Sequence, residues 1–443
     1  MRNNTTILTN ILNKVDSESR PYQLQLEINC FIDWLTNVAL GISNKNYKKI
    51  VAASGFDKYN GQLTDLLSDS HLCTPALRAL LLGTAAHFED FDDVNIPAQS
   101  HLTAVIMSAV MAVGVKHDLE FAPCFSAFSV GYEYAAQFAV VNANNVSGLG
   151  YHPTSIFGGI GAAVATSQLM NLSPKEILSA ISLAATRVSG LRAAFGTMIK
   201  PLHVGWAARI GVESALLARS GIETNHDLWC GQGGKLMTLG LSPTAKILDR
   251  KQVGWISQNT FKIYASCFGT QAAAVCAEAA KERAEDHGWN ILHMCLNVGA
   301  DNERICSIED PKTAEELKFS IKGIVAMIIS GHNPKNPLLI TQHNFNDMSY
   351  RKSLKLISIN YDKSLNFAQA RLQATTKKGG AINIIEDLRG EQKQEVQRKN
   401  LIKRIQSVIG DQFMYEVSDL LASLEDESRM TIRDGIDKIR DIR

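Results

Sequence analysis

The stretch Gly148–Gly211 decides the fold: GLGYHPTSIFGGIGAAVATSQLM (148–170), followed by NLSPKEILSAISLAATRVSGLRAAFGTMIKPLHVGWAARIG (171–211). It consists largely of Gly, Ala and aliphatic residues, interrupted by two polar groups, YHPT at 151–154 and KPLH at 200–203. Small residues let helices pack closely, and ionisable side chains between such helices are costly unless they are paired or used. The stretch therefore predicts core helices whose ends carry groups that bind anions or transfer protons.

The composition is that of an ordinary globular protein. The chain has 443 residues, enough for two domains with buried cores. Hydrophobic residues make up 45%, charged residues 20%, and the net charge is +1. This balance gives no reason to expect nucleic acid or an acidic membrane as a partner. No stretch reaches the roughly 20 apolar residues of a membrane span, and the N-terminus lacks the apolar segment of a signal peptide, so we expect a cytoplasmic protein.

The cysteines predict no metal centre. The eight cysteines are scattered and form no CxxC motif, which makes zinc and iron–sulfur sites unexpected and favours buried, reduced thiols. Asp and His side chains could still bind zinc or manganese, but no HxxxH or HxH spacing occurs. We therefore expect no metal and no other cofactor, with metal-assisted chemistry as the less favoured alternative.

An acidic cluster precedes a very apolar helix. A helix is predicted from Thr74, with Pro75 at its first position, and it leads into Glu89, Asp90, Asp92 and Asp93. The next predicted helix, HLTAVIMSAVMAVGV (101–115), has almost no polar face and should be buried. Its first residue, His101, would then lie where backbone N–H groups attract anions. A solvated helix end is the alternative for the acidic cluster.

Two further polar residues take the same position on later helices. After a predicted helix over 119–141 and a loop over 142–150, His152 opens the apolar helix that follows it. A capping box at 173–176 starts the next helix, and Lys200 and His203 lie in the first turn of the one after that. A single histidine at a helix end is usually structural. The convergence of His101, His152 and Lys200 on helix N-termini instead indicates a shared site.

The pattern changes after Gly240. Alternating segments at 292–302, 353–362 and 366–377 predict strands, and a capping box at 313–316 predicts a helix between the first two. We predict a mainly α protein in which residues 1–253 form a large all-helical domain and residues 254–400 a smaller α+β domain. The C-terminal helices, 401–443, should pack back on the first domain.

These residues resemble the MmgE/PrpD family, which includes methylcitrate dehydratases, cis-aconitate decarboxylases and iminodisuccinate epimerases. The matching motifs lie in the same order over about residues 20–400. They are GTAAH (83–87), DFDD (90–93), His101, GYE (131–133), HPT (152–154), GTM (196–198) and KPLHVG (200–205), with weaker echoes at Lys262–Tyr264, Cys267, Lys318–Ser320 and Arg389–Gly390.

The resemblance implies a homodimer whose smaller domain is a lid, with the active site between the two domains. It also implies cofactor-free chemistry on small polycarboxylates. The catalytic residues of the family correspond to Asp90, His101, His152 and Lys200. We assign His152 or His101 as the general base or acid and Asp90 to orienting a histidine.

Substrate contacts are assigned to Lys200 and His203, with Thr154 and Gln271 as further substrate-binding residues.

Three hypotheses for the function remain open. The first is a lyase that dehydrates or decarboxylates a di- or tricarboxylate, and the second is an epimerase or isomerase that uses the same proton abstraction. The third is a catalytically impaired, ligand-binding homologue. It is favoured by three departures from the family pattern: Val94 replaces a threonine, Gly323 a lid tyrosine and Gln271 a histidine.

Overall fold

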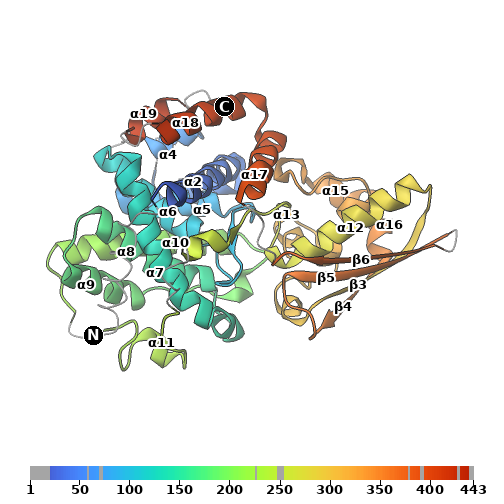
Figure 1. The fold of residues 1–443 in the computed structure, drawn as a ribbon, viewed down its shortest axis with the longest axis horizontal. Helices are drawn as coiled ribbons and strands as arrows, with labels where there is room; N and C mark the ends of the chain where they lie inside the picture. The colour runs from blue at the N-terminus through green and yellow to red at the C-terminus, as the bar shows by residue number, and fades with distance from the viewer. Residues whose placement is uncertain are drawn as a thin grey trace.

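The computed structural model describes residues 20–56, 59–68, 73–224, 227–246, 254–377, 380–389, 394–426 and 430–438. A body of helices lies on the left of Figure 1, and a smaller unit with a sheet projects to the right. The mainly α fold with a smaller α+β part is therefore confirmed. Residues 1–19 and the motif echo at Gly390 lie outside the described residues.

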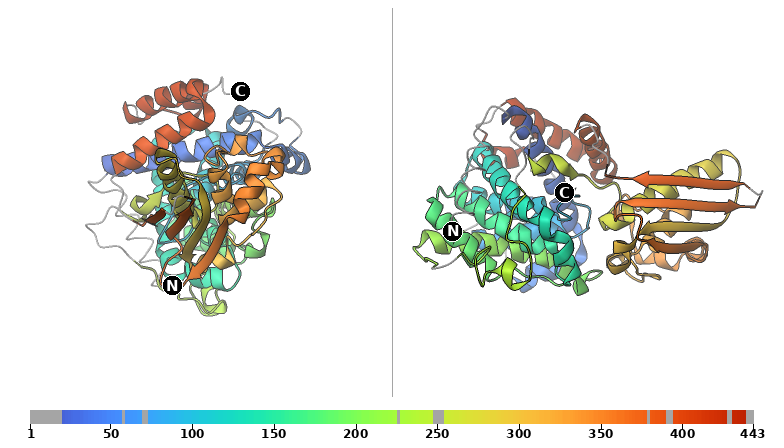
Figure 2. Two further views of the ribbon diagram at one scale, coloured as in Figure 1. Left: turned by 90° about the vertical axis from the view of Figure 1, so that its right-hand side faces the viewer. Right: turned by 60° about the horizontal axis from the view of Figure 1, so that its bottom comes forward.

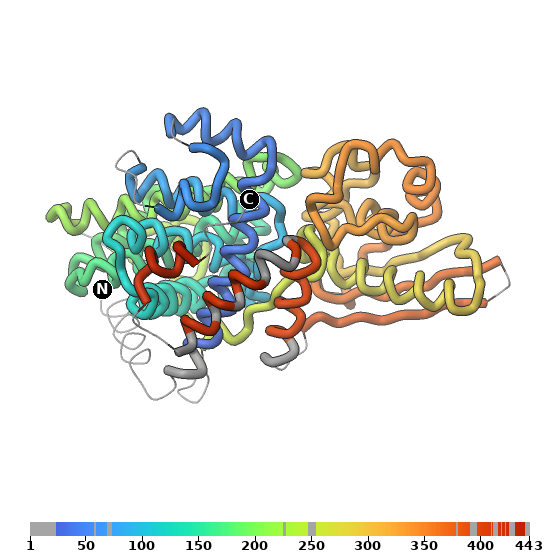
Figure 3. Tube along the Cα trace, turned by 90° about the horizontal axis from the view of Figure 1, so that it is seen from above, coloured from blue at the N-terminus to red at the C-terminus, as the bar shows by residue number. Residues whose placement is uncertain are grey.

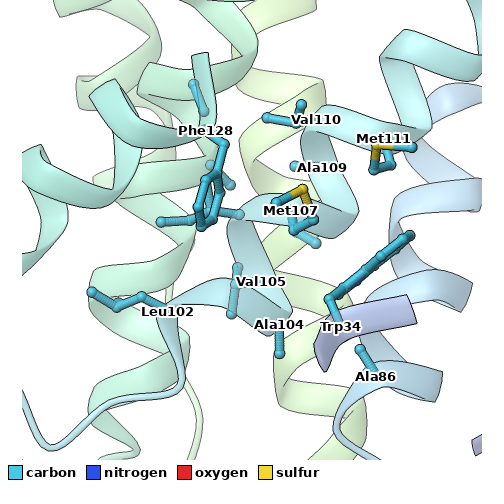
Figure 4. Close-up of a cluster of buried hydrophobic side chains, with 14 of the residues drawn as sticks. Trp34, Ala86, Leu102, Ala104, Val105, Met107, Ala109, Val110, Met111 and Phe128 are labelled. Atoms are coloured by element: carbon cyan, nitrogen blue, oxygen red, sulfur yellow. The ribbon is translucent and has the colours of Figure 1, made fainter. Parts of the chain in front are cut away.

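Helix α6 (Leu102–His117) is the centre of the body. All its residues from Leu102 to Val115 are buried, as its sequence predicts. Around it pack α2 (Arg20–Ser43), α5 (Pro75–Ala86), α7 (Phe121–Gly148), α8 (Pro153–Leu169) and α10 (Ile199–Arg219). Figure 4 shows Met107 and Val110 of α6 among side chains such as Trp34 and Phe128 from neighbouring helices.

Small residues allow the helices of the body to touch through their backbones. A Cβ atom at Gly131 in α7 would lie 2.4 Å from the carbonyl oxygen of Gly161 in α8. One at Gly211 in α10 would lie 2.4 Å from the Cβ of Ala162. Larger residues at these positions would force the helices apart, which explains why this stretch is rich in Gly and Ala.

Local capping signals place several helix starts correctly. Thr74 caps α5 and Ser173 forms the expected capping box of α9 (Pro174–Ala185). The predicted loop over 142–150 is wrong, because α7 continues to Gly148. Asn142 explains the difference: its side-chain amide donates to the Phe138 carbonyl within the helix and to the Ser242 carbonyl of a distant segment.

The smaller unit is built on a four-stranded sheet of the described residues, with strand order β4-β3-β5-β6. The strands are β3 (Ile291–Gly299), β4 (Ile357–Asp362), β5 (Gln369–Thr376) and β6 (Ala381–Asp387). β3 is parallel to β4, and the other pairs are antiparallel. The first, second and third predicted strands are confirmed, whereas β6 was missed.

One face of this sheet is covered by helices. Helices α12 (Phe268–Asp286) and α14 (Ile321–Ile329) pack against the sheet, with α16 (Met348–Lys355) beside α14. Along β5, buried and exposed residues alternate, as expected for a sheet with one covered face. The right-hand view of Figure 2 shows the strands extending away from the body.

The C-terminal helices return to the body, as predicted. α17 (Gln394–Ile409) and α18 (Asp411–Asp426) contact α2, and α19 (Ile432–Asp437) contacts α6. Seen from above in Figure 3, these segments cross the body rather than the sheet. In the described part of the chain, no helix combines the length and apolarity needed to cross a membrane.

A short ladder joins the body to the start of the smaller unit. Strand β1 (Val94–Asn95) pairs with β2 (Asn259–Thr260), and Trp255 and Ile256 belong to the hydrophobic core of the body. A second core begins only at Tyr264. We therefore propose that the domain boundary lies near residue 264 rather than 254. Residues 264–389 are called the lid below.

Candidate active site

The turn after α5 carries the acidic cluster, and it is buried. Helix α5 ends at Ala86, and Asp90 then adopts a left-handed conformation with φ 51°. That conformation is uncommon for a residue with a side chain and needs support from its surroundings. Asp90 and Asp92 are 2% and 1% exposed, so the predicted alternative of a solvated helix end is wrong.

Two lysines hold the carboxylate of Asp90. The ammonium group of Lys200 lies 2.6 Å from one oxygen, and that of Lys262 lies 2.5 Å from the other. Lys262 also donates to the Asp90 carbonyl oxygen at 2.7 Å. Burial alone would raise the pKa of Asp90, but the two ammonium groups outweigh it and hold that pKa well below its usual value. Asp90 is therefore a carboxylate at neutral pH.

His87 connects Asp92 to Lys200. Its Nδ1 lies 2.8 and 2.9 Å from the two Asp92 oxygens, and its Nε2 lies 2.7 Å from the Lys200 ammonium. An ammonium group can only donate, so Nε2 accepts and Nδ1–H donates to Asp92. Burial lowers the pKa of His87 to about 4, against the opposing effect of Asp92. The imidazole is thus neutral.

His101 faces the same cluster from the start of α6. Its Nδ1 lies 2.6 Å from the Asp93 carbonyl oxygen and 3.3 Å from an Asp92 oxygen. A carbonyl oxygen only accepts, so Nδ1 carries a proton. Its Nε2 lies 4.0 Å from an oxygen of Asp90. The backbone N–H of His101 donates to the hydroxyl of Thr154, which fixes this residue at the helix end.

His152 and His203 lie near His87, the histidine that Lys200 contacts. The His152 ring centroid is 6.0 Å from that of His87 and 5.6 Å from that of His203. Burial, with Lys200 adding to it, lowers the pKa of His152 well below its usual value and that of His203 to about 4. Nδ1 of each ring has no hydrogen-bond partner within the described residues. Buried polar atoms normally have a partner, so both nitrogens are available to a ligand.

The lid closes over this cluster. Lys318 of the lid donates to the Phe88 carbonyl at 2.9 Å and to the Glu89 carboxylate at 2.7 Å. The Lys200 ammonium lies 5.0 Å from the ring centroid of Phe319. The space left beside His87, Asp90, Lys200 and Phe319 is about 10 Å³, roughly one water molecule. In this arrangement the space beside Lys200 is too small for a molecule much larger than water.

The comparison with known proteins gives the family. Residues 11–246, more than half of the 443, match the MmgE/PrpD N-terminal domain. The chain belongs to the MmgE/PrpD family.

Relatives within this family include decarboxylases. The chain is 33% identical to cis-aconitate decarboxylase of Homo sapiens over 170 residues, which are 36% of this chain and 34% of the relative. It is 31% identical to the cis-aconitate decarboxylase-like protein oryM of Aspergillus oryzae over 184 residues, 38% of this chain and 37% of the relative. With cis-aconitate decarboxylase of Aspergillus terreus it shares 26% over 209 residues, 44% and 43% of the two chains. The matched segments thus span less than half of each relative.

The residues assigned from the MmgE/PrpD motifs divide into two groups. Asp90, His101, His152, Lys200 and His203 come together around one point. Two others make structural contacts instead. Thr154 supports His101, as described above.

Gln271 supports the loop that carries Lys262. Its side-chain oxygen accepts from the N–H groups of Ile263 and Tyr264, and its amide nitrogen donates to the Tyr264 carbonyl. It also lines a second cavity, of about 480 Å³, together with Lys262 and Arg404. A substrate-binding role for Gln271 stays a prediction.

The role of orienting a histidine, predicted for Asp90, stays a prediction, and Asp92 is a second candidate for it. Short carboxylate–imidazole contacts are made by Asp92, while the closest histidine contact of Asp90 is 4.0 Å. His87, Asp92, Lys262 and Lys318 were quoted in the family motifs but given no role. Their signal in the sequence is membership of the motifs alone. Lys262 and Lys318 pair with carboxylates from distant segments, and the pairing of His87 with Asp92 depends on the turn between them.

The same cluster contains possible metal ligands. Ligand atoms of His87, Asp90, Asp92 and His101 all lie within 4.8 Å of one another. However, Nε2 of His87 and one oxygen of Asp90 already accept from the Lys200 ammonium, and Lys262 holds the other oxygen. A divalent cation would have to displace Lys200 and approach two positive charges. The residues therefore fit a metal poorly in this arrangement.

Proposed function

We propose that this protein is a cofactor-independent lyase that acts on a small di- or tricarboxylate by removing a proton next to a carboxylate. The observation that carries the proposal is the Lys200 ammonium, buried between the neutral imidazole of His87 and the carboxylate of Asp90. His101 and His152 flank this arrangement. Positive charges and neutral imidazoles are the two components that such a reaction requires.

The lysines would bind the carboxylates of the substrate. Lys200 and Lys318 lie at the opening between body and lid. When the lid opens, Lys318 leaves Glu89 and both ammonium groups can face an anion. Lysine suits this task as a compact charge with several donors. The negative charge that develops during proton removal would be stabilised by the same groups.

A histidine would take the proton. His152 and His203 are neutral because burial and Lys200 disfavour their charged forms. A bound polyanion would offset the effect of Lys200 and raise the pKa of a nearby imidazole toward neutrality, where a general base is most effective. His101 Nε2 or His152 is therefore assigned as the base. In a dehydration, the enolate-like species expels its β-hydroxyl group, which takes up a proton and leaves as water. In a decarboxylation, loss of carbon dioxide leaves a carbanion, and the protonated histidine returns its proton to that carbon.

The family relatives support this class of reaction. The proteins with matching segments are named cis-aconitate decarboxylases, which are lyases. The family pattern has a lid tyrosine where this chain has Gly323. Gly323 is buried near the start of α14, where a Cβ would lie 2.8 Å from atoms of Leu317 and Pro311. The proposal therefore includes dehydration as well as decarboxylation.

We also propose that the protein is a homodimer. Met198, the N-cap residue of α10, and Ile199 and Trp206 on that helix expose 37%, 47% and 44% of their surface. Large exposed apolar residues that are neighbours on one helix are typical of an interface. Light scattering after gel filtration tests this directly, and a monomer at micromolar concentration would contradict it.

The decisive test is a substrate panel in deuterated water. The purified chain is incubated with 2-methylcitrate, citrate, cis-aconitate and iminodisuccinate, and the products are identified by mass spectrometry. We expect an unsaturated or decarboxylated product from one tricarboxylate. Deuterium incorporation into an epimer without elimination would instead make the protein an isomerase. Thermal stabilisation by these acids without any product would favour a ligand-binding homologue.

A further inference from the structure

We propose that Cys267 and Cys306, which lie against each other in the lid beside the candidate active site, form a reversible disulfide when the protein meets a peroxide. The proposal concerns the thiols themselves and holds whether or not the lyase function does.

The backbone brings the two cysteines together from separate segments of the lid, the start of α12 and the turn that follows β3. The Cys267 N–H donates to the Lys318 carbonyl at 2.9 Å, and the Ile321 N–H donates to the Cys306 carbonyl at 3.2 Å. The two thiols are close enough that each shifts the pKa of the other. A Cβ atom at Gly269, two residues after Cys267, would lie 3.1 Å from the sulfur of Cys306. The start of α12 is thus packed directly on the second thiol.

The surroundings make the two thiols unequal. Cys267 is the N-cap residue of the 19-residue helix α12 and is partly exposed, whereas Cys306 is buried. The Cys306 thiol lowers the pKa of Cys267, and Lys200 and Lys262 add to this against burial and Asp90. Burial and Cys267 raise the pKa of Cys306. Cys267 is therefore the thiolate that attacks, and Cys306 is the thiol that resolves.

The chemistry is balanced with hydrogen peroxide as the oxidant. The Cys267 thiolate attacks one peroxide oxygen, the O–O bond breaks, and a sulfenic acid forms while the other oxygen leaves as water after protonation. The Cys306 sulfur then attacks the sulfenic sulfur, which forms the S–S bond and releases a second water. Two thiols are oxidised by two electrons, and a dithiol reductant reverses the reaction.

Oxidation would change the candidate site through two contacts. Cys267 follows the loop of Lys262, which holds Asp90, and it is bonded to the backbone of Lys318, which holds Glu89. A disulfide removes the thiolate from this region and ties α12 to the segment around Cys306. We expect turnover to fall at least about fivefold and to recover with dithiothreitol.

The primary test is chemical and uses the full chain. Reduced protein is treated with hydrogen peroxide, the remaining thiols are blocked with N-ethylmaleimide, and tryptic peptides are analysed by mass spectrometry. We expect a peptide pair linked through Cys267 and Cys306 that disappears after dithiothreitol. Cys230 and Cys295, which are also partly exposed, should stay alkylated. Full alkylation of Cys267 and Cys306 after peroxide treatment would overturn the proposal.

Single substitutions distinguish the attacking thiol, Cys267, from the resolving thiol, Cys306. Cys276→Ser is the matched control, because Cys276 lies on the same helix and in the same tryptic peptide, 263–281, yet is buried elsewhere. It should form the disulfide at the wild-type rate. Cys306→Ser should stop at the sulfenic acid of Cys267, trapped by dimedone, and Cys267→Ser should leave Cys306 unoxidised. Oxidation of Cys306 at an unchanged rate in Cys267→Ser would overturn the assignment. Circular dichroism confirms that each variant is folded.

Discussion

The ammonium group of Lys200 joins the imidazole of His87 to the carboxylate of Asp90, at 2.7 and 2.6 Å. Lys200, which is 4% exposed to solvent, thus contacts both a neutral imidazole and a carboxylate. This arrangement leads to the first of five predictions.

Replacing Lys200 should abolish catalysis while leaving the fold in place. Lys200→Met keeps most of the side-chain volume and removes the charge, and Lys262 still neutralises Asp90. We expect turnover of the substrate found by the panel to fall at least about 100-fold, as for loss of a group that stabilises developing charge. Lys175→Ala is the control, because Lys175 is exposed and paired only with exposed Glu223. Turnover within twofold of the wild type in Lys200→Met would remove Lys200 from the mechanism.

His152 should be needed for turnover but not for stability. Its buried Nδ1 has no partner in the described residues, so its removal costs no hydrogen bond at that atom. We expect His152→Ala to lose most turnover with only a small change in melting temperature. His287→Ala, at an exposed histidine of the lid, should change neither. A large fall in melting temperature for His152→Ala would instead assign this residue a structural role.

Acid should destabilise the protein through its buried histidines. The pKa of His203 is lowered to about 4 in the folded state, so between pH 6.5 and 4 the unfolded chain binds more protons. Stability from this group is present above pH 6.5 and is lost as the pH falls toward 4. Burial and Asp33 raise the pKa of Asp93, so the contribution of Asp93 to stability changes with pH in the opposite direction. The prediction therefore concerns the difference between the wild type and a His203 variant.

The measurement compares melting temperatures at pH 7.5 and 5.0. The wild type should lose more stability over this interval than His203→Gln does. The excess should be about 1 kcal/mol, roughly half of the ~2 kcal/mol that the full shift would give between pH 6.5 and 5.0. Equal losses in the two proteins would show that His203 titrates normally in the folded state.

The Lys318–Glu89 ion pair should hold the lid closed. Both side chains are buried, at 4% and 7% exposure, so Lys318→Ala leaves a buried carboxylate with only Asn44 as a partner of those described here. We expect the free energy that holds the lid against the body to fall by about 3 kcal/mol. Backbone hydrogen exchange around residues 314–321 should become faster as a result. Lys322→Ala, which removes an exposed pair with Glu309, should leave exchange unchanged. Unaltered exchange in Lys318→Ala would show that other contacts hold the lid.

Chelation should not affect activity. The Lys200 ammonium occupies the position between His87 and Asp90 that a metal would need. We expect full turnover after dialysis against EDTA and no stoichiometric zinc or manganese by mass spectrometry of the purified protein. Loss of turnover on chelation that zinc or manganese restores would establish the metal-assisted alternative.

Local signals made much of the body predictable. Thr74 with Pro75, and Ser173 with Glu176, identify helix starts because the capping partners are neighbours in sequence. The continuation of α7 to Gly148 was not predictable, since Asn142 is held by Ser242, 100 residues away. Contacts of this kind have no local pattern.

The candidate site follows the same division. His101, His152 and Lys200 could be selected because each is a polar residue at the start of an apolar helix. Lys262 could not, because its partner Asp90 is 172 positions away and the intervening chain has no fixed spacing. His87 ends a helix and was indistinguishable in sequence from a surface residue. Only the fold shows that it lies between Asp92 and Lys200.

The β1–β2 ladder anchors one part of the candidate site to the body, while another part belongs to the lid. It fixes Asn259 against Asn95, three residues before Lys262, so Lys262 is anchored to the body together with Asp90 and the histidines. Lys318 and Phe319 belong to the lid. If the proposed function holds, the groups assigned to proton transfer are built into the body, and substitutions in the lid could alter substrate preference without disturbing them.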